Sequence, residues 1–199
     1  IKDVTGPLGM PTEMAEGPCA VIGGGVGLAI AFPVAKHLVE TGHEVHAIMG
    51  ARTKDLLLLE EQFRSLLPED HIHITTDDGS YGEKGVVTAP LERLLQAKAV
   101  DQVFCVGPVP MMKFSSLTAE KYGTPITASL NPIMVDGTGM CGCCRVEVGG
   151  ETKFACVDGP DFDGYEVDFD SAMERGTMYR DFERHKHEET CNLFKKAEN

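Results

Sequence analysis

The sequence has little positive charge and no long apolar run. Its 18 lysine and arginine residues stand against 31 aspartate and glutamate residues, for a formal net charge of −13. Such a surface repels the phosphate backbone, so we expect no nucleic-acid partner. No apolar stretch approaches the roughly 20 residues that a membrane span needs, and the first residues lack the pattern of a signal peptide. We therefore expect no membrane span.

Disulfide bonds are not indicated either. The seven cysteines are an odd number, and Cys143 is adjacent to Cys144 in the chain. Free thiols in an acidic chain without a signal peptide are typical of a reducing compartment. We therefore expect a cytoplasmic protein whose clustered cysteines bind a metal.

The cysteines that are present gather in one stretch. Counted from Asp136, the spacing is Asp-x4-Cys141-x2-Cys144-x11-Cys156, and a short predicted hairpin precedes Cys156. This is the spacing of a plant-type [2Fe–2S] loop in which a carboxylate takes the place of the first cysteine. Glycines within the loop let the backbone approach a cluster closely and direct N–H groups at its sulfides. The stretch predicts a [2Fe–2S] site.

A structural zinc site is the alternative. Cys141, Cys144 and Cys156, together with Cys143 or Asp136, would satisfy tetrahedral zinc. Zinc sites more often show two separated C-x2-C pairs, whereas the second half here offers a single cysteine, so we favour iron–sulfur. The fourth ligand stays open, because Asp136 fits the register and Cys143 is the softer donor.

Alternating strand and helix patterns precede the cysteines. We expect helices at 28–41, 54–67 and 89–97 and a fourth that opens at 107 and ends near 123. The expected strands are 18–22, 44–49, 71–75, 101–106 and 125–130. This alternation predicts an α/β fold: a five-stranded parallel doubly wound nucleotide-binding sheet followed by a small C-terminal [2Fe–2S] cluster subdomain.

Three segments follow the carboxyl ends of these strands. Glycine-rich residues 23–27 lead into a helix, which is a phosphate cradle, although Leu28 stands where the full dinucleotide fingerprint has its third glycine. Residues 77–85 and 107–111 follow the expected strands at 71–75 and 101–106. We expect all three segments to converge on one crevice.

Two histidines alternate on the third expected strand. His71 and His73 would share one face, but the surrounding sequence has no partners at metal-ligand spacing. We expect solvated or edge histidines here.

Several motifs together resemble a known family. They are Gly-Gly-Gly-Val-Gly at 23–27, Thr-Asp-Asp-Gly-Ser-Tyr-Gly at 76–82, Gly-Pro-Val-Pro-Met at 107–111, Leu-Asn-Pro-Ile-Met-Val-Asp-Gly-Thr-Gly-Met-Cys-Gly at 130–142 and Phe-Ala-Cys-Val-Asp-Gly-Pro at 154–160. In this order they resemble the ferredoxin–NADP reductase superfamily. Within it, they resemble the small (alpha) subunits of NADH-dependent ferredoxin:NADP oxidoreductases, close to the electron-transfer subunits of dihydroorotate dehydrogenase. The resemblance extends from about residue 6 to about residue 178.

The resemblance implies roles for particular residues. Arg52 would lie near the adenosine ribose, and Asp77 belongs to the expected crevice. The pyrophosphate would be held by Gly23, Gly24, Gly25, Val26 and Gly27, and the nicotinamide would lie by Gly107, Pro108 and Met111. The cluster ligands would be Asp136, Cys141, Cys144 and Cys156.

The nucleotide is less well defined than its site. No acidic residue of the kind that marks NAD follows the second expected strand, and Arg52 there suits a 2′-phosphate, so NADP(H) is possible. The resemblance favours NAD(H), which we expect.

The resemblance also implies a domain that is not in this sequence. Related chains begin with an FAD-binding β-barrel of about a hundred residues. We expect residues 1–17 to be the linker from that barrel, 18–130 the NAD(P)-binding domain, 131–170 the cluster subdomain and 171–199 a helical tail. Nicotinamide gives up two electrons together whereas the cluster takes one, so FAD is expected in the full-length protein.

The expected function follows from these cofactors. We expect an electron-transfer subunit of a flavin-dependent NAD(P)H oxidoreductase, in a hetero-oligomer with a larger iron–sulfur or flavin redox subunit or with ferredoxin. The alternatives are a subunit that serves dihydroorotate dehydrogenase, and a nucleotide-binding module with structural zinc. No protein side chain is expected to act as a catalytic acid or base. The acidic stretch 161–170 would be a solvated strand or a docking face, and Cys19, Cys105 and Cys191 would be core or incidental residues.

Overall fold

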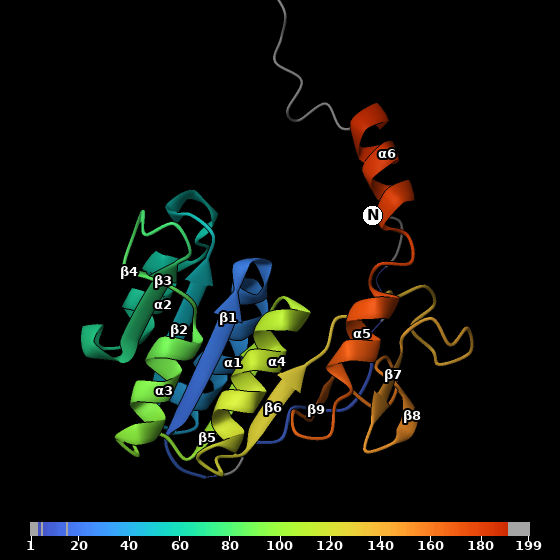
Figure 1. Cartoon of the computed structure of the whole chain (residues 1–199). Coiled ribbons are helices and arrows are strands. Elements are labelled where there is room, and N and C mark those ends of the chain that lie inside the picture. Colours follow the sequence, from blue (N-terminus) through green and yellow to red (C-terminus); the bar gives the residue numbers. More distant parts are fainter. Residues whose placement is uncertain (1–3, 5, 15, 191–199) are drawn as a thin grey trace, which may run out of the picture.

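The fold is a single mixed sheet covered by helices, with a smaller hairpin region at one end (Figure 1). The computed structural model describes residues 4, 6–14 and 16–190, the last four of these as backbone only. The sheet has the strand order β4-β3-β2-β1-β5-β6-β9. Its central strands are β1 (Cys19–Gly24), β2 (Val45–Ala51), β3 (Ile72–Thr76), β5 (Gln102–Val106) and β6 (Ile126–Ser129).

These central strands confirm the predicted doubly wound arrangement. All five run parallel, and the strand order reverses direction between β1 and β5. Two short strands form the edges of the sheet. β4 (Glu83–Lys84), which is parallel to β3, was not predicted, and β9 (Asp161–Asp163), which is antiparallel to β6, is a strand in the acidic stretch for which a strand was one of two expectations. The acidic stretch 161–170 therefore begins as part of the main sheet.

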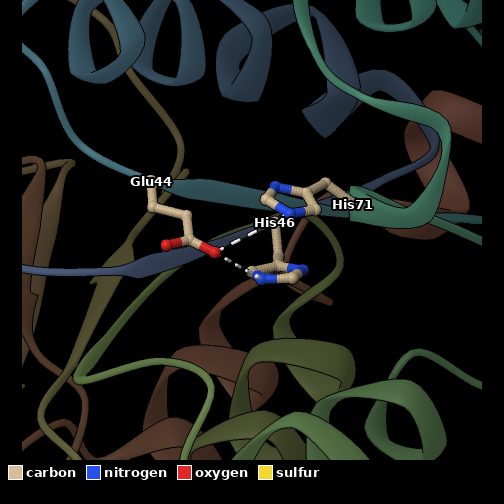
Figure 2. A group of neighbouring side chains, drawn as sticks. All are labelled: Glu44, His46 and His71. Atoms are coloured by element: carbon tan, nitrogen blue, oxygen red, sulfur yellow. Dashed lines mark ion pairs between the residues drawn. The ribbon is translucent and has the colours of Figure 1, made fainter.

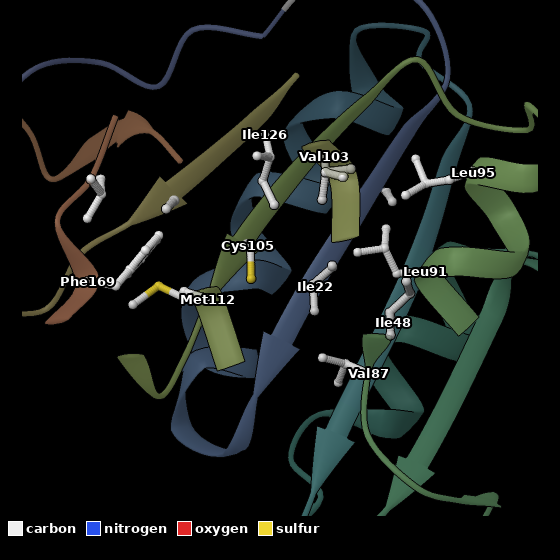
Figure 3. Packing of buried hydrophobic residues seen from close by; sticks show 14 of the residues in the cluster. Ile22, Ile48, Val87, Leu91, Leu95, Val103, Cys105, Met112, Ile126 and Phe169 are labelled. Carbon is white, nitrogen blue, oxygen red and sulfur yellow. The ribbon is translucent and has the colours of Figure 1, made fainter. Parts of the chain in front are cut away.

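Helices cover both faces of the sheet because the central strands are apolar on both sides. Helices α1 (Leu28–Glu40) and α2 (Glu60–Leu66) pack on one face through residues such as Leu38 and Phe63. Helices α3 (Thr88–Gln96) and α4 (Val109–Glu120) cover the other face. Figure 3 shows this second core, where Leu91 and Leu95 of α3 and Met112 of α4 meet the strands.

The predicted helix at 54–67 is wrong in its first half. A 3-10 turn, η2 (Lys54–Leu56), is followed by three residues outside any helix before α2 begins. Leu59 has a left-handed backbone with φ of 59°, and Leu57 and Leu59 pack against the buried core. Burial of these leucines therefore interrupts the helical pattern that the sequence suggests. Two further 3-10 turns are η1 (Gly25–Gly27) and η3 (Glu69–His71).

The region after β6 contains the cysteine loop and a hairpin. Strands β7 (Arg145–Val148) and β8 (Glu151–Phe154) form the predicted hairpin around Gly149 and Gly150, which both have positive φ. Helix α5 (Phe169–Arg175) packs Phe169 into the second core, and Asp168 caps its first turn by accepting from the Ser171 N–H at 2.9 Å. The hairpin region is thus anchored to the sheet through β9 and α5.

The remaining helix is α6 (Arg180–Thr190), which stands away from the sheet in Figure 1. The predicted helical tail at 171–199 agrees with α5 and α6, and its last residues, Cys191 among them, lie outside the described ranges. None of the helices within those ranges is long and apolar enough to cross a membrane.

Candidate nucleotide crevice and metal centre

A cavity of about 910 Å³ opens at the carboxyl ends of the parallel strands. It lies where the strand order reverses, which is the position at which doubly wound sheets bind ligands. Most of the residues predicted for a nucleotide line it: Gly24, Gly25, Val26, Gly27, Arg52, Asp77, Gly107, Pro108 and Met111. Their roles toward a nucleotide stay predictions, but the structure brings them to one place.

Two parts of the prediction do not reach the cavity. Gly23 lies within β1, and a Cβ there would come within 2.9 Å of the Leu28 Cα, so its place is explained by packing of α1 on the strand. Residues 78–85 form a turn and β4 instead of lining the cavity, while Val86, Val87 and Thr88 line it in their place.

Close backbone approach shapes the floor of the crevice. A Cβ on Gly27 would overlap the carbonyl oxygen of Val106 at the end of β5, and one on Gly24 would overlap the sulfur of Met111. Only glycine allows the turn after β1 to lie this close to the neighbouring strand. The turn continues into α1, and the Leu28 N–H at the start of this helix donates to the carbonyls of Gly25 and Val26. The N–H groups that would face a phosphate are therefore those of the turn itself.

The charges in the crevice are mixed. Arg52 lines it together with the carboxylates Asp55 and Asp77. The Asp77 N–H donates to the Ala51 carbonyl at 3.1 Å, which holds the end of β3 against the end of β2. A nucleotide adenosine at this end of the crevice would thus meet one cation and two anions.

The hydroxyl of Thr75 was missed by the sequence analysis. Thr75 is 1% exposed on β3 and lines the cavity, and within the described part of the chain its Oγ1 has no hydrogen-bond partner. A buried unpaired hydroxyl costs free energy, so such a group at a cavity wall indicates a polar ligand. A threonine inside a strand carries no sequence signal that distinguishes this position.

The cysteine loop is folded around the carboxylate of Asp136. Its Oδ1 accepts from the Thr138 N–H at 2.7 Å, and its Oδ2 accepts from the Cys141 N–H at 2.9 Å. These bonds, foremost the one from the Thr138 backbone, hold the pKa of Asp136 below its usual range. The side chain is therefore an ionised carboxylate, directly beside the first cysteine of the loop.

The cysteines form an inner and an outer group. Cys144 and Cys156 are buried, and their sulfurs are 3.1 Å apart, which is too long for a disulfide. Cys141 is exposed, and its sulfur accepts from the Cys143 N–H at 3.5 Å. The hydrogen bond with Cys144 raises the pKa of the Cys156 thiol, so metal binding there must displace protons.

The cysteine sulfurs are not gathered as they would be around one zinc ion. Ligands of a tetrahedral zinc ion at about 2.3 Å lie about 3.8 Å apart, so at least three sulfurs have to gather closely. Among the described residues, the cysteine loop contains no group of three ligand atoms within 4.8 Å of one another. One close pair with further donors spaced away from it suits a two-iron cluster, in which each iron takes two protein ligands.

The remaining described cysteines belong to the core. Burial raises the pKa of both Cys19 and Cys105 to about 12, so each stays a protonated thiol. Neither lines the cavity, which confirms the expectation of a core role. Two carboxylates of the acidic stretch 161–170 have partners within the chain. Asp170 pairs with Lys113 at 2.6 Å, and Asp163 accepts from the Tyr165 N–H in a turn.

The expectation that His71 has no partners at metal-ligand spacing is wrong. His71 does have partners at metal-ligand distance, namely Glu44 and His46 at the start of β2 (Figure 2). Residues 46 and 71 are 25 positions apart in the sequence, and the parallel pairing of β2 with β3 brings them together. No spacing rule within one segment could have found this group.

Two protein-family models match the chain. An oxidoreductase NAD-binding domain matches residues 21–116, and the iron–sulfur cluster binding domain of dihydroorotate dehydrogenase B matches residues 131–168. The first contains the glycine turn and every crevice residue except Asn131, and the second contains all four predicted cluster ligands. The domain boundaries that we drew from the sequence stay predictions.

Individual relatives agree with these matches. A Thermotoga maritima protein described as a dihydroorotate dehydrogenase B (NAD(+)), electron transfer subunit homolog is 50% identical over 92% of this chain and 64% of its own length. A probable subunit of the same kind from Methanocaldococcus jannaschii is 34% identical over 91% of this chain and 68% of its own. The chain thus spans about two thirds of the length of such relatives.

A solved structure is similar in fold as well as in sequence. It is that of an NADH-dependent reduced ferredoxin–NADP oxidoreductase, described in connection with flavin-based electron bifurcation. The TM-score is 0.82 with 47% identity, over 94% of this chain and 67% of the solved one.

Proposed function

The chain belongs to the family of electron transfer subunits of the dihydroorotate dehydrogenase B type, and we propose that it carries electrons between a nicotinamide nucleotide and a [2Fe–2S] cluster by way of FAD. The observation that carries this proposal is the position of Asn131. It is the first residue matched by the iron–sulfur domain, and it lines the nucleotide cavity. Asn131 also lines a small pocket together with Cys143, so this residue connects the nucleotide cavity with the cysteine loop.

The chemistry requires a flavin between them. A hydride carries two electrons, whereas a [2Fe–2S] cluster accepts one. FAD is the cofactor that can take up two electrons together and release them one at a time. The residues of this chain would bind and orient the nucleotide. The turn at Gly25 and Gly27 offers backbone N–H groups to the pyrophosphate, and Pro108 and Met111 form the apolar wall where a nicotinamide ring would lie.

We propose NAD(H) as the nucleotide. Arg52 by itself would suit a 2′-phosphate, but Asp55 and Asp77 line the same cavity and would repel its charge. A ribose hydroxyl can instead donate hydrogen bonds to a carboxylate. NADP(H) is the alternative. Measuring the affinities of the protein for NADH and for NADPH decides between them.

We propose Asp136, Cys141, Cys144 and Cys156 as the cluster ligands. The ionised carboxylate of Asp136 is already folded against Cys141, whereas the Cys143 carbonyl is held by the Arg175 guanidinium at 3.2 Å. That bond ties the Cys143 backbone to α5. The thiolates supply the soft donors that an iron–sulfur cluster prefers.

The surface around the loop suits a redox partner. Three apolar side chains of the loop are exposed: the neighbours Met134 (49%) and Val135 (68%), and Met140 (88%), which is an unusual degree of exposure within seven residues. A larger iron–sulfur or flavin subunit, or ferredoxin, would cover this surface and accept electrons there. We favour transfer to ferredoxin or to such a subunit, because the fold is similar to that of the solved ferredoxin–NADP oxidoreductase, with a TM-score of 0.82 and 47% identity. Transfer to dihydroorotate dehydrogenase is the second candidate, favoured by the names of the relatives.

The test follows cluster reduction in the full-length protein that contains this chain. NADH is added anaerobically before and after FAD is removed, and the reduced cluster is detected by EPR. We expect reduction only when FAD is bound, and recovery when FAD is returned. Reduction without FAD, or no reduction in the FAD-loaded protein, would contradict the proposal. Adding either ferredoxin or a dihydroorotate dehydrogenase catalytic subunit then decides between the two acceptors.

A further inference from the structure

A second cluster of metal-ligand side chains lies at the amino ends of the parallel strands, whereas the crevice lies at their carboxyl ends. Glu44 and His46 are at the start of β2, and His71 directly precedes β3 (Figure 2). Their ligand atoms all lie within 4.8 Å of one another, and no other histidine, cysteine or acidic group in the described ranges meets that condition. His46 is 8% exposed, so one of the three is held inside the protein.

The distances within the group do not correspond to hydrogen bonds. Glu44 Oε1 is 3.7 Å from the Nε2 of His46 and 3.7 Å from the Nε2 of His71. An N–H···O hydrogen bond would be about 2.7 to 3.2 Å long. Two ligands of one zinc ion, with bonds of about 2.05 Å and angles of 110 to 120°, lie about 3.3 to 3.6 Å apart. The group has the spacing of ligands around an ion.

In both His46 and His71, a hydrogen bond at Nδ1 leaves Nε2, the nitrogen that faces Glu44, free to bind a metal. His71 Nδ1 is 3.1 Å from the Val45 carbonyl, which can only accept, so this nitrogen carries the proton. In neutral His71, Nε2 therefore has a lone pair. His46 Nδ1 is 3.4 Å from His73 Nε2, and donation from His46 leaves its Nε2 free as well. Metal-bound histidines typically donate their other N–H to such a partner.

In that state, three acceptors face one another. The Glu44 carboxylate and the two Nε2 lone pairs would repel unless a cation lies between them. The rings of His46 and His71 are stacked at 4.1 Å with 21° between their planes, so their lone pairs run side by side toward Glu44. For both lone pairs to reach one ion, the His71 ring has to tilt toward Glu44, and this side chain is the more exposed of the two histidines.

We propose that Glu44, His46 and His71 form a binding site for a divalent transition-metal ion of the zinc type, with water completing its coordination. Two imidazoles and a carboxylate are donors that suit Zn²⁺ and are too nitrogen-rich for Mg²⁺ or Ca²⁺. The site joins the amino ends of β2 and β3. Bound metal would stabilise the folded chain at the end of the sheet that is opposite the crevice.

The test uses tag-free, anaerobically purified protein whose iron content is measured in every sample. Zn²⁺ is titrated by calorimetry into wild type and into the variants Glu44→Gln, His71→Gln and His37→Gln. His37 is an exposed histidine on α1 outside the group and serves as the matched control. The cysteine loop is the same in all four proteins, so any zinc that it binds cancels in the comparison.

We expect one zinc ion per chain that is lost, or bound at least tenfold more weakly, in Glu44→Gln and His71→Gln but not in His37→Gln. The exposed Glu44 can be changed without disturbing the core, so its variant keeps the test independent of folding. Equal zinc binding in all four proteins, or no zinc binding in wild type beyond that of His71→Gln, would overturn the proposal. Neither outcome depends on whether the chain transfers electrons.

Discussion

The nucleotide crevice and the cysteine loop are connected through Asn131 but are built in opposite ways. The crevice is formed by the ends of buried strands, with β1, β2 and β5 among the least exposed parts of the chain. The loop from 131 to 144 has no helix or strand, and its described contacts are mainly hydrogen bonds to Asp136 and contacts between cysteines.

This difference indicates how each site depends on its cofactor. The sheet core fixes the crevice whether or not a nucleotide is bound. The loop needs the energy of metal–thiolate bonds to hold a single conformation, so metal binding and loop order are coupled. Variants in the loop should therefore affect the cluster alone, and variants in the crevice should affect both nucleotide binding and folding.

The largest effect is expected for Cys156→Ser. Loss of a buried thiolate ligand should lower iron from about two per chain by at least fivefold, because a serine oxygen is a poor substitute for sulfur. Affinity for NADH, measured by calorimetry, should stay within about twofold of wild type. Cys105→Ala is the control, since that buried thiol is outside the loop and its loss should leave iron unchanged. Equal iron loss in both variants would mean that folding, and not ligation, was tested.

The comparison of Asp136→Ala with Cys143→Ser sharpens the assignment of the fourth ligand. Asp136→Ala removes both the proposed ligand and the acceptor for two backbone N–H groups, so iron should fall severalfold. Cys143→Ser should keep about two irons per chain. Iron and sulfide analysis of both variants is the measurement. Iron loss in Cys143→Ser with retention in Asp136→Ala would reverse the assignment.

Gly27→Ala should damage the crevice while sparing the loop. The added methyl group overlaps the Val106 carbonyl, and relieving this contact should cost about 1 to 3 kcal/mol of the free energy of unfolding. NADH affinity should fall at least tenfold because the turn moves away from β5. Urea unfolding and calorimetry measure the two effects. In the control variant Gly25→Ala, whose added methyl group meets nothing within 4 Å, only a left-handed backbone is strained, so a smaller loss of stability is expected.

The smallest effect is expected for Thr75→Val, and its two parts have opposite signs. Removing an unpaired buried hydroxyl should raise the free energy of unfolding of the nucleotide-free protein by about 1 kcal/mol. NADH affinity should fall about threefold to tenfold if that hydroxyl binds the nucleotide. A drop in stability, or an unchanged affinity, would show that Thr75 has no such role.

The sequence predicted those parts of the fold that depend on local patterns. The five parallel strands, the glycine turn after β1 and the hairpin at Gly149 and Gly150 all have short-range signals, and all are present. The helix at 54–67 was overpredicted, because burial of Leu57 and Leu59 overrides a pattern that looks amphipathic.

Features that depend on tertiary pairing could not be predicted in this way. A strand was one of the two expectations for residues 161–170, but the antiparallel pairing of β9 with β6 in the main sheet has no local signal. The unpaired hydroxyl of Thr75 and the group formed by Glu44, His46 and His71 depend on which strands are neighbours and in what register. Candidate ligands within one loop are visible from spacing, whereas ligands from two strands are not.

The most direct test of the account is the metal content and EPR spectrum of the anaerobically purified chain. The proposal that the cysteine loop is a redox site predicts about two irons per chain and an EPR signal that appears on chemical reduction. Zinc in place of iron, with no signal on reduction, would contradict it and leave a nucleotide-binding domain with a structural metal.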